Sequence, residues 1–172
     1  AESYRAALPL IDDSLARSEV ERRLGALYLD MGQIDKAVRE LRKAASAAPD
    51  DAAAQGLLGQ ALIKSAQRRG EPAGGPTFES ARQCLQRAAR ADQPAPPILA
   101  ALGGLLLSAD QIPDAEKALL RALKDQPDLV PALLSLGQLR LGQGDVASAY
   151  EQALRAYARL RGEQGPDAIQ TR

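Results

Sequence analysis

Few side chains in this sequence have the type and spacing that catalysis requires. The single thiol, Cys84, would need a neighbouring base to become a nucleophile, and the sequence has no His and no Lys pattern around it. The adjacent carboxylates Asp50 and Asp51 are typical of a helix cap in a solvated turn rather than of an acid and base pair. Gly74 and Gly75 lack the Lys-Ser/Thr that completes a phosphate-binding loop. We therefore expect no enzyme, no cofactor and no metal site in these residues.

The composition excludes further classes of function. The 172 residues contain 22 Lys and Arg against 22 Asp and Glu, so the formal net charge is zero. A protein that binds nucleic acids or anionic membranes would usually carry more basic than acidic residues. Aromatic residues make up only 3% of the chain, which offers few rings for stacking on bases. No apolar stretch reaches the eighteen or so residues of a membrane span, so we expect none.

The ends and the residue usage favour an excerpt of a longer protein from a bacterium. The chain begins at Ala1 without Met or a signal-peptide pattern, and neither end has an obvious polar cap. Abundant Ala, Arg, Gly and Pro are typical of GC-rich coding. Low Cys content leaves the compartment open between cytoplasm and periplasm.

An internal repeat organises the chain. Leu-Gly pairs recur at Leu24-Gly25, Leu58-Gly59, Leu102-Gly103 and Leu136-Gly137. The spacing is 34 residues from the first pair to the second and from the third to the fourth. It is 44 residues from the second to the third, which is one period plus ten residues. Fixed periods of this length are the signature of stacked repeats.

Each Leu-Gly pair is followed by a second set of small and apolar residues at helical spacing. The sets are Ala37, Leu41 and Ala44, then Ala81, Leu85 and Ala88, then Ala115, Leu119 and Ala122, and finally Ala149, Ala153 and Ala156. Small residues at matched positions let two antiparallel helices approach closely. The sequence therefore predicts an all-α chain of helical hairpins, in which Gly32 and Gly144 end helices and Pro97 and Pro131 begin them.

This pattern resembles the tetratricopeptide repeat (TPR) over about residues 18–163. Leu24-Gly25-Ala26-Leu27-Tyr28, Gly32, Ala37, Leu41, Ala44 and Pro49 match nearly the whole family signature in the first copy. The fourth copy is the weakest match, because Arg140 replaces the family's Tyr. The resemblance implies a right-handed superhelical α-solenoid of four hairpins, whose first helices line a concave groove. The expected segments are a flanking helix at 1–17, repeats at 18–51, 52–95, 96–129 and 130–163, and a tail or start of a further helix at 164–172.

The ten extra residues of the second repeat lie near 68–77, between its two helices. The segment from Arg68 to Pro76 is rich in Gly and Pro and predicts a loop. It is a tolerated surface insertion, a mobile flap that touches a partner, or an extension of the second helix pair beyond its neighbours.

The resemblance also indicates which residues would line the groove. These partner-binding candidates are Arg22, Arg23, Ala26, Leu29, Gln60, Ile63, Lys64, Gly104, Leu107, Gln138 and Leu141. Chaperone-binding members of the family clamp a terminal carboxylate with a Lys/Asn/Arg set. This sequence contains no Asn, so we reject that clamp.

Several of these candidates have a second interpretation. Three leucines are compatible both with the core between repeats and with a groove lining: Leu29, Leu107 and Leu141. The two arginines, Arg22 and Arg23, are compatible both with solvated surface charges and with an anion-binding site. The apolar segment Ile98–Leu107 suits burial in the array, a ligand-binding stripe or a dimer contact.

The favoured function is a non-catalytic scaffold that binds a peptide or an amphipathic helix of another protein. The alternative is a structural spacer or a self-associating segment within a larger bacterial secretion, envelope or transferase protein. A self-associating segment would form a homo-oligomer.

Overall fold

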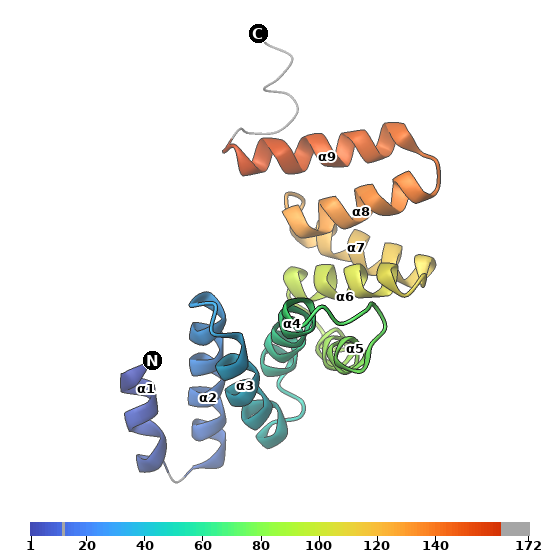
Figure 1. Ribbon diagram of the computed structural model, residues 1–172. Coiled ribbons are helices and arrows are strands. Elements are labelled where there is room, and N and C mark those ends of the chain that lie inside the picture. Colours follow the sequence, from blue (N-terminus) through green and yellow to red (C-terminus); the bar gives the residue numbers. More distant parts are fainter. Residues whose placement is uncertain (12, 163–172) are drawn as a thin grey trace. The chain divides into compact units, whose positions relative to one another are not determined.

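The computed structural model describes residues 1–11 and 13–162. Within these residues the chain forms nine α-helices and one 3-10 turn and no strand, so the all-α prediction is confirmed (Figure 1). The helices pair as antiparallel hairpins of the TPR type. They divide into two compact units, Ala1–Pro94 and Ala95–Arg172, which are taken in turn.

Unit 1 contains two hairpins and a short leading element. Its elements are α1 (Glu2–Ala7), the 3-10 turn η1 (Leu8–Leu10), α2 (Ser14–Asp30), α3 (Ile34–Ala47), α4 (Ala52–Arg68) and α5 (Pro76–Ala88). Helix α2 pairs with α3 and α4 with α5, while α4 also packs on α3 and α1 on α2. The Asp51 side chain caps α4 by accepting hydrogen bonds from the N–H groups of Ala53 and Ala54 at 2.9 and 3.2 Å.

Unit 2 contains the third and fourth hairpins. Its elements are α6 (Pro96–Ser108), α7 (Ile112–Asp125), α8 (Val130–Gly142) and α9 (Val146–Leu160). Helix α8 packs on both α6 and α7, and α9 pairs with α8. Pro97 and Pro131 lie in first turns, where the missing N–H groups cost no helical hydrogen bond.

A glycine facing a leucine fixes the close approach of the helices in the first three hairpins. The three Gly–Leu pairs are Gly25 with Leu41, Gly59 with Leu85 and Gly103 with Leu119. A Cβ atom at each glycine would lie 2.5 to 2.6 Å from the leucine Cγ. The three leucines have no exposed surface. Only glycine leaves room for the leucine, and this explains why a glycine follows the leucine in the Leu-Gly motif.

The fourth hairpin lacks this pair. Ala153 occupies the leucine position and is exposed, and a Cβ at Gly137 would meet only ordinary contacts at 3.5 Å or more. Val146, at the start of α9, is also exposed, whereas Ile34 at the matching position of α3 is buried. The α9 helix thus makes a thinner core with α8 than the second helices of the earlier hairpins make with their partners.

The ten extra residues of the second repeat lengthen its hairpin. Measured from the Leu-Gly pairs, α4 runs four residues further than α6. Measured from Ala81 and Ala115, α5 starts two residues earlier than α7, and the connection 69–75 takes the other four. Glu71 anchors this connection by accepting the Thr77 N–H at 2.7 Å, and Arg69 donates to the Thr77 hydroxyl at 2.6 Å. The connection is therefore held to the start of α5 by its own polar side chains.

The N-terminal segment differs from the expected single flanking helix. Residues 2–10 form α1 and η1, and α2 begins at Ser14 because Asp13 accepts the N–H of Leu15 and caps the helix there. The first repeat helix therefore starts upstream of residue 18. The expected tail or further helix at 164–172 lies outside the described residues.

Candidate functional site

The reactive side chains of the described residues form no catalytic constellation. Cys84 on α5 is half-buried, and burial raises the pKa of its thiol despite the opposing charges of Arg87 and Arg42. A thiol with a raised pKa is a poor nucleophile at neutral pH. Among residues 1–11 and 13–162, no group of three or more Cys, Asp or Glu side chains is arranged to hold a metal ion. In the same ranges, no helix combines the length and the apolar character of a membrane span.

The arginine pair of unit 1 is neutralised by acidic neighbours. Arg22 pairs with Glu19 on its own helix, and its Nε lies 3.4 Å from an Oδ of Asp51, the cap of α4. Arg23 donates to Glu19 at 2.6 Å. Hydrogen bonds from Arg23 and then Arg22 lower the pKa of Glu19, so it stays ionised at neutral pH. Arg22 therefore tethers α2 to the cap of α4, and the two arginines present little unbalanced positive charge.

The other candidates of unit 1 differ in exposure. Ala26, Gln60 and Ile63 are half-buried and Lys64 is exposed. Leu29 is only 8% exposed, so the prediction that it lines a surface is wrong. It belongs to the core of unit 1, as the second interpretation of this residue required.

The candidates of unit 2 gather where α6 and α8 pack together. Gly104 and Leu107 on α6 are half-buried, and Gln138 and Leu141 on α8 are exposed. A Cβ at Gly104 would lie 3.5 Å from the Ser135 hydroxyl oxygen, so these two small residues mark the seam between the helices.

We call the exposed part of α6 and α8 the first-helix surface of unit 2. It consists of Gly104, Leu107, Leu134, Ser135, Gln138 and Leu141. Leu134 was missed as a candidate in the sequence, although it lies four residues before Gln138 and seven before Leu141, on the same helix face. Every member is uncharged.

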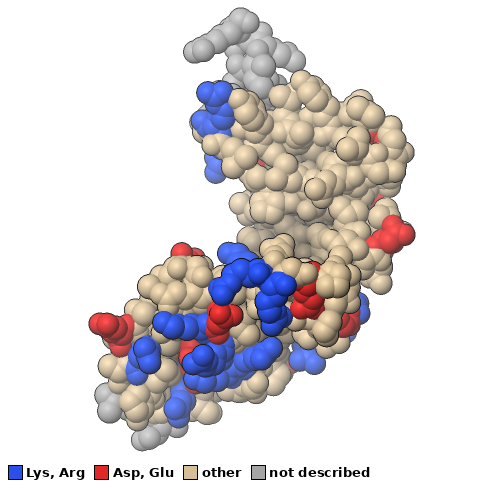
Figure 2. Space-filling view, in the orientation of Figure 1, with Lys and Arg blue, Asp and Glu red and all other residues tan. Residues whose placement is uncertain are grey.

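The two units differ in charge. Figure 2 shows Lys and Arg side chains gathered over unit 1, whereas the face of unit 2 in this view is mostly uncharged. In unit 1 many of these charges are compensated, for example Arg68 by Asp35 at 3.2 Å. The uncharged first-helix surface of unit 2 is therefore the better candidate for an apolar ligand.

A second exposed apolar feature lies on α9 and was not expected from the sequence. Val146, Tyr150, Tyr157 and Leu160 are 51 to 71% exposed and lie on one face of the helix. Their spacing can be read from the sequence, but their exposure cannot, because exposure depends on which helices pack beside α9.

Family models for the tetratricopeptide repeat match two parts of the chain, residues 18–61 and residues 100–168. No curated protein sequence matches significantly. Proteins of this family are generally non-catalytic scaffolds for interactions between proteins.

Solved structures share the fold. A crystal structure of MamA superposes with a TM-score of 0.70 at 21% identity, covering 94% of this chain and 86% of MamA. PilF of Pseudomonas aeruginosa gives a TM-score of 0.65 at 26% identity, over 88% of this chain and 64% of PilF. YrrB, described as a TPR protein with an unusual peptide-binding site, gives 0.62 at 18% identity, over 80% of this chain and 66% of YrrB. From the phased hairpins, the Gly–Leu pairs and the two family matches, we conclude that this chain belongs to the tetratricopeptide repeat family.

Proposed function

We propose that the protein is a non-catalytic interaction module that binds an apolar peptide or the apolar face of a partner's helix on the first-helix surface of unit 2. The observation that carries this proposal is the exposure of Leu134 and Leu141 beside the small residues Gly104 and Ser135. Exposed leucines that border small residues leave room for the side chains of a ligand.

The physical chemistry of the surface selects the class of ligand. The surface carries no charge, so a charged peptide would lose hydration without gaining an ion pair. Gln138 is exposed and offers both a donor and an acceptor to a peptide backbone. In unit 1, Arg22 and Arg23 are already paired, so the proposal assigns them to structure.

The comparison with YrrB supports a peptide ligand. That protein shares the fold and is described as having a peptide-binding site. The likeness at 18% identity concerns the fold alone, so the choice of an uncharged apolar ligand rests on the residues of this chain.

The test is a selection of peptides followed by mutation of the surface. Peptides selected from a displayed random library against the whole chain should be rich in apolar residues. Their affinity, measured by fluorescence anisotropy, should fall at least about tenfold for Leu141→Glu, because a buried unpaired carboxylate costs more than 1.4 kcal/mol.

Leu120→Glu is the matched control. Leu120 is a comparably exposed leucine of unit 2, but it lies on α7 rather than on a first helix. Equal affinity of the wild type and the Leu141→Glu variant, or an equal loss for both variants, would show that the surface is assigned wrongly.

One observation favours the structural alternative as a second function. Val146, Tyr150 and Leu160 on α9 are 63 to 71% exposed, more than Leu134 and Leu141 of the first-helix surface at 48 and 59%, and this apolar face suits self-association within an assembly. The two functions use different helices and can coexist in one protein.

A further inference from the structure

The exposed face of α9 has the spacing of a helix-pairing seam. Val146, Tyr150, Ala153, Tyr157 and Leu160 follow one another at intervals of four, three, four and three residues. This alternation is the heptad spacing of a coiled-coil stripe, and all five residues are exposed. We call these five residues the α9 stripe.

The earlier hairpins show how such a face is normally covered. Helix α3 packs on α4 and α7 packs on α8, so within each unit the second helix of the first hairpin meets the first helix of the following hairpin. Among the described residues, no helix packs on α9 apart from its hairpin partner α8. A solvent-exposed apolar surface of this extent indicates a site of contact with another molecule.

We propose that the α9 stripe pairs with the α9 stripe of a second copy of this chain, antiparallel and about a two-fold axis. The axis passes between positions 150 and 153. Tyr150 then lies over Ala153 of the other copy, and Tyr157 lies over Val146 of the other copy. Each large ring meets a small side chain, and the same surface is used on both copies, as closed two-fold symmetry requires.

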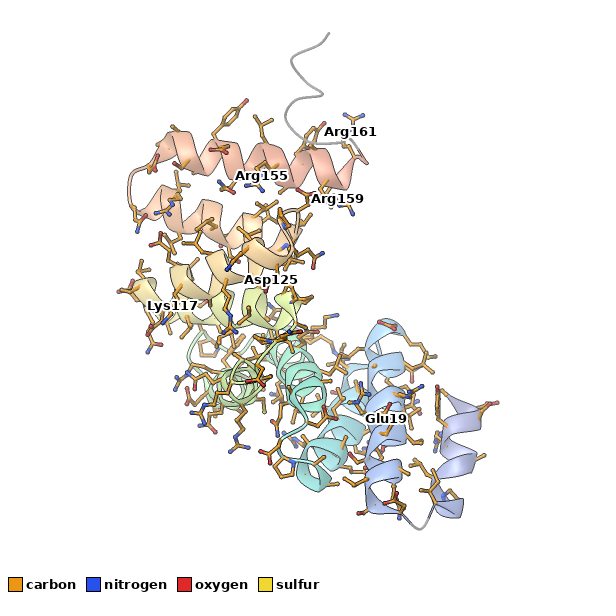
Figure 3. All side chains as sticks on the ribbon, turned by 180° about the vertical axis from the view of Figure 1, so that it is seen from behind. Glu19, Lys117, Asp125, Arg155, Arg159 and Arg161 are labelled. Atoms are coloured by element: carbon orange, nitrogen blue, oxygen red, sulfur yellow. The ribbon has the colours of Figure 1, made fainter. Side chains whose placement is uncertain are left out.

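The charges around the stripe fit this arrangement. The five residues of the stripe are uncharged, and at its C-terminal end the Arg161 guanidinium lies 5.7 Å from the centroid of the Tyr157 ring and donates to the Tyr157 hydroxyl at 2.7 Å. Figure 3 shows Arg155 and Arg159 on the side of α9 that looks toward the rest of unit 2, and Arg155 donates to the Pro127 carbonyl at 2.8 Å. The antiparallel direction brings the Arg161 end of one helix to the Asp145 end of the other, and it also opposes the two helix dipoles favourably. A parallel pair would set like ends together.

The area of the contact sets its strength. A buried tyrosine contributes about 150 Å² or more, so two half-exposed tyrosines with Val and Leu offer roughly 400 Å² per copy. The total of about 800 Å² is below the 1,200 Å² or so of a standard interface. We therefore expect a weak dimer whose population depends on protein concentration.

Sedimentation velocity of the whole chain over a wide concentration range tests the pairing. The wild type should shift from monomer to dimer as the concentration rises. Tyr150→Glu should raise the dissociation constant at least about tenfold, because each copy would bury a carboxylate without a partner. Tyr157→Ala should also weaken the dimer, because it removes the ring that packs on Val146 of the other copy. Leu120→Glu is again the control, since it adds the same charge at an exposed leucine on α7. A monomer at every concentration, or a dimer that survives both tyrosine variants, overturns the proposal.

Disulfide trapping in a Cys84→Ser background tests the register. A mixture of Tyr150→Cys chains and Ala153→Cys chains should form the mixed disulfide as its main product, since these positions face each other in the proposed pair. Glu151→Cys, exposed beyond the edge of the stripe, should form little disulfide with either. A higher yield from Ala153→Cys chains alone would indicate a parallel pair and overturn the register. Peptide binding by the Tyr150→Glu variant, measured in parallel, separates failure of this proposal from failure of the proposed function.

Discussion

At the scale of single residues, the Leu-Gly motif is explained by the volume of the side chain that faces the glycine. Gly103 leaves the space that Leu119 fills, and a Cβ there would also lie 3.3 Å from the carbonyl oxygen of Ala115. The same motif at Gly137 meets no leucine, because the matching residue of α9 is Ala153. The sequence repeats the glycine four times, but the structure requires it only three times.

Gly103→Ala should therefore destabilise the protein and Gly137→Ala should not. We expect a loss of about 1–3 kcal/mol for Gly103→Ala from overpacking. For Gly137→Ala we expect no loss, or a gain of up to about 1 kcal/mol from the better helix propensity of Ala. Urea unfolding followed by circular dichroism measures both. Equal destabilisation by the two variants would contradict the volume argument.

Glu21 is a second residue whose environment can be tested. Its side chain lies in the core of unit 1 and is only 7% exposed. Burial raises its pKa above 4.5, against the weaker opposing effects of Lys43 and Arg17, the latter 3.8 Å away. The folded protein therefore holds this proton more tightly than the unfolded chain does. The corresponding stability is present below pH 4.5 and is lost as the pH rises through the raised pKa.

Glu21→Gln should accordingly be more stable than the wild type at pH 7. The gain should be small, because the partly screened carboxylate of the wild type keeps its ion pair with Arg17. The advantage should shrink as the pH is lowered through the raised pKa of Glu21, because the wild-type carboxyl then becomes protonated. Urea midpoints at a series of pH values check this, and a gain that grows on acidification would refute it.

At the scale of elements, the second hairpin depends on an anchor inside its connection. A hydrogen bond from the Thr77 side chain, assisted by the Thr77 N–H, lowers the pKa of Glu71. Its stabilising effect is present above the ordinary pKa of 4.5 and is lost as the pH falls through the lowered value. The connection 69–75 is thus an ordered extension of the helix pair.

Glu71→Ala should loosen the first turn of α5. We expect faster amide exchange at Thr77 and its neighbours and unchanged exchange in α7, which lies in the other unit. Glu71→Gln retains an acceptor oxygen and should keep most of the protection. Hydrogen exchange read by mass spectrometry compares the three proteins. Unchanged exchange in the alanine variant would show that the anchor does not order the connection.

At the scale of the whole molecule, stability should follow the neighbours that each helix has. In a repeat array each unit is stabilised by its own packing and by the interface with the next. Helix α3 has α2 and α4 as partners and buries Leu41 completely. Helix α9 has α8 alone among the described residues and lacks the matching leucine.

We expect hydrogen exchange to be slowest in α3, α4 and α7 and fastest in α1 and α9. At concentrations where the α9 stripes pair, exchange in α9 should slow while exchange in α1 should not change. Native-state exchange at two protein concentrations measures this order. Greater protection of α9 than of α7 in the monomer would contradict the neighbour argument.

The sequence by itself determined the family, the hairpins and many of the helix ends. Phased Leu-Gly pairs, small residues at matched positions, and capping by Asp51 act locally, so they can be identified in one dimension. Exposure depends on which helices pack beside a residue, and spacing alone does not fix that. Tertiary structure therefore decided that Leu29 is buried, that Arg22 and Arg23 are paired, and that the apolar face of α9 lies open.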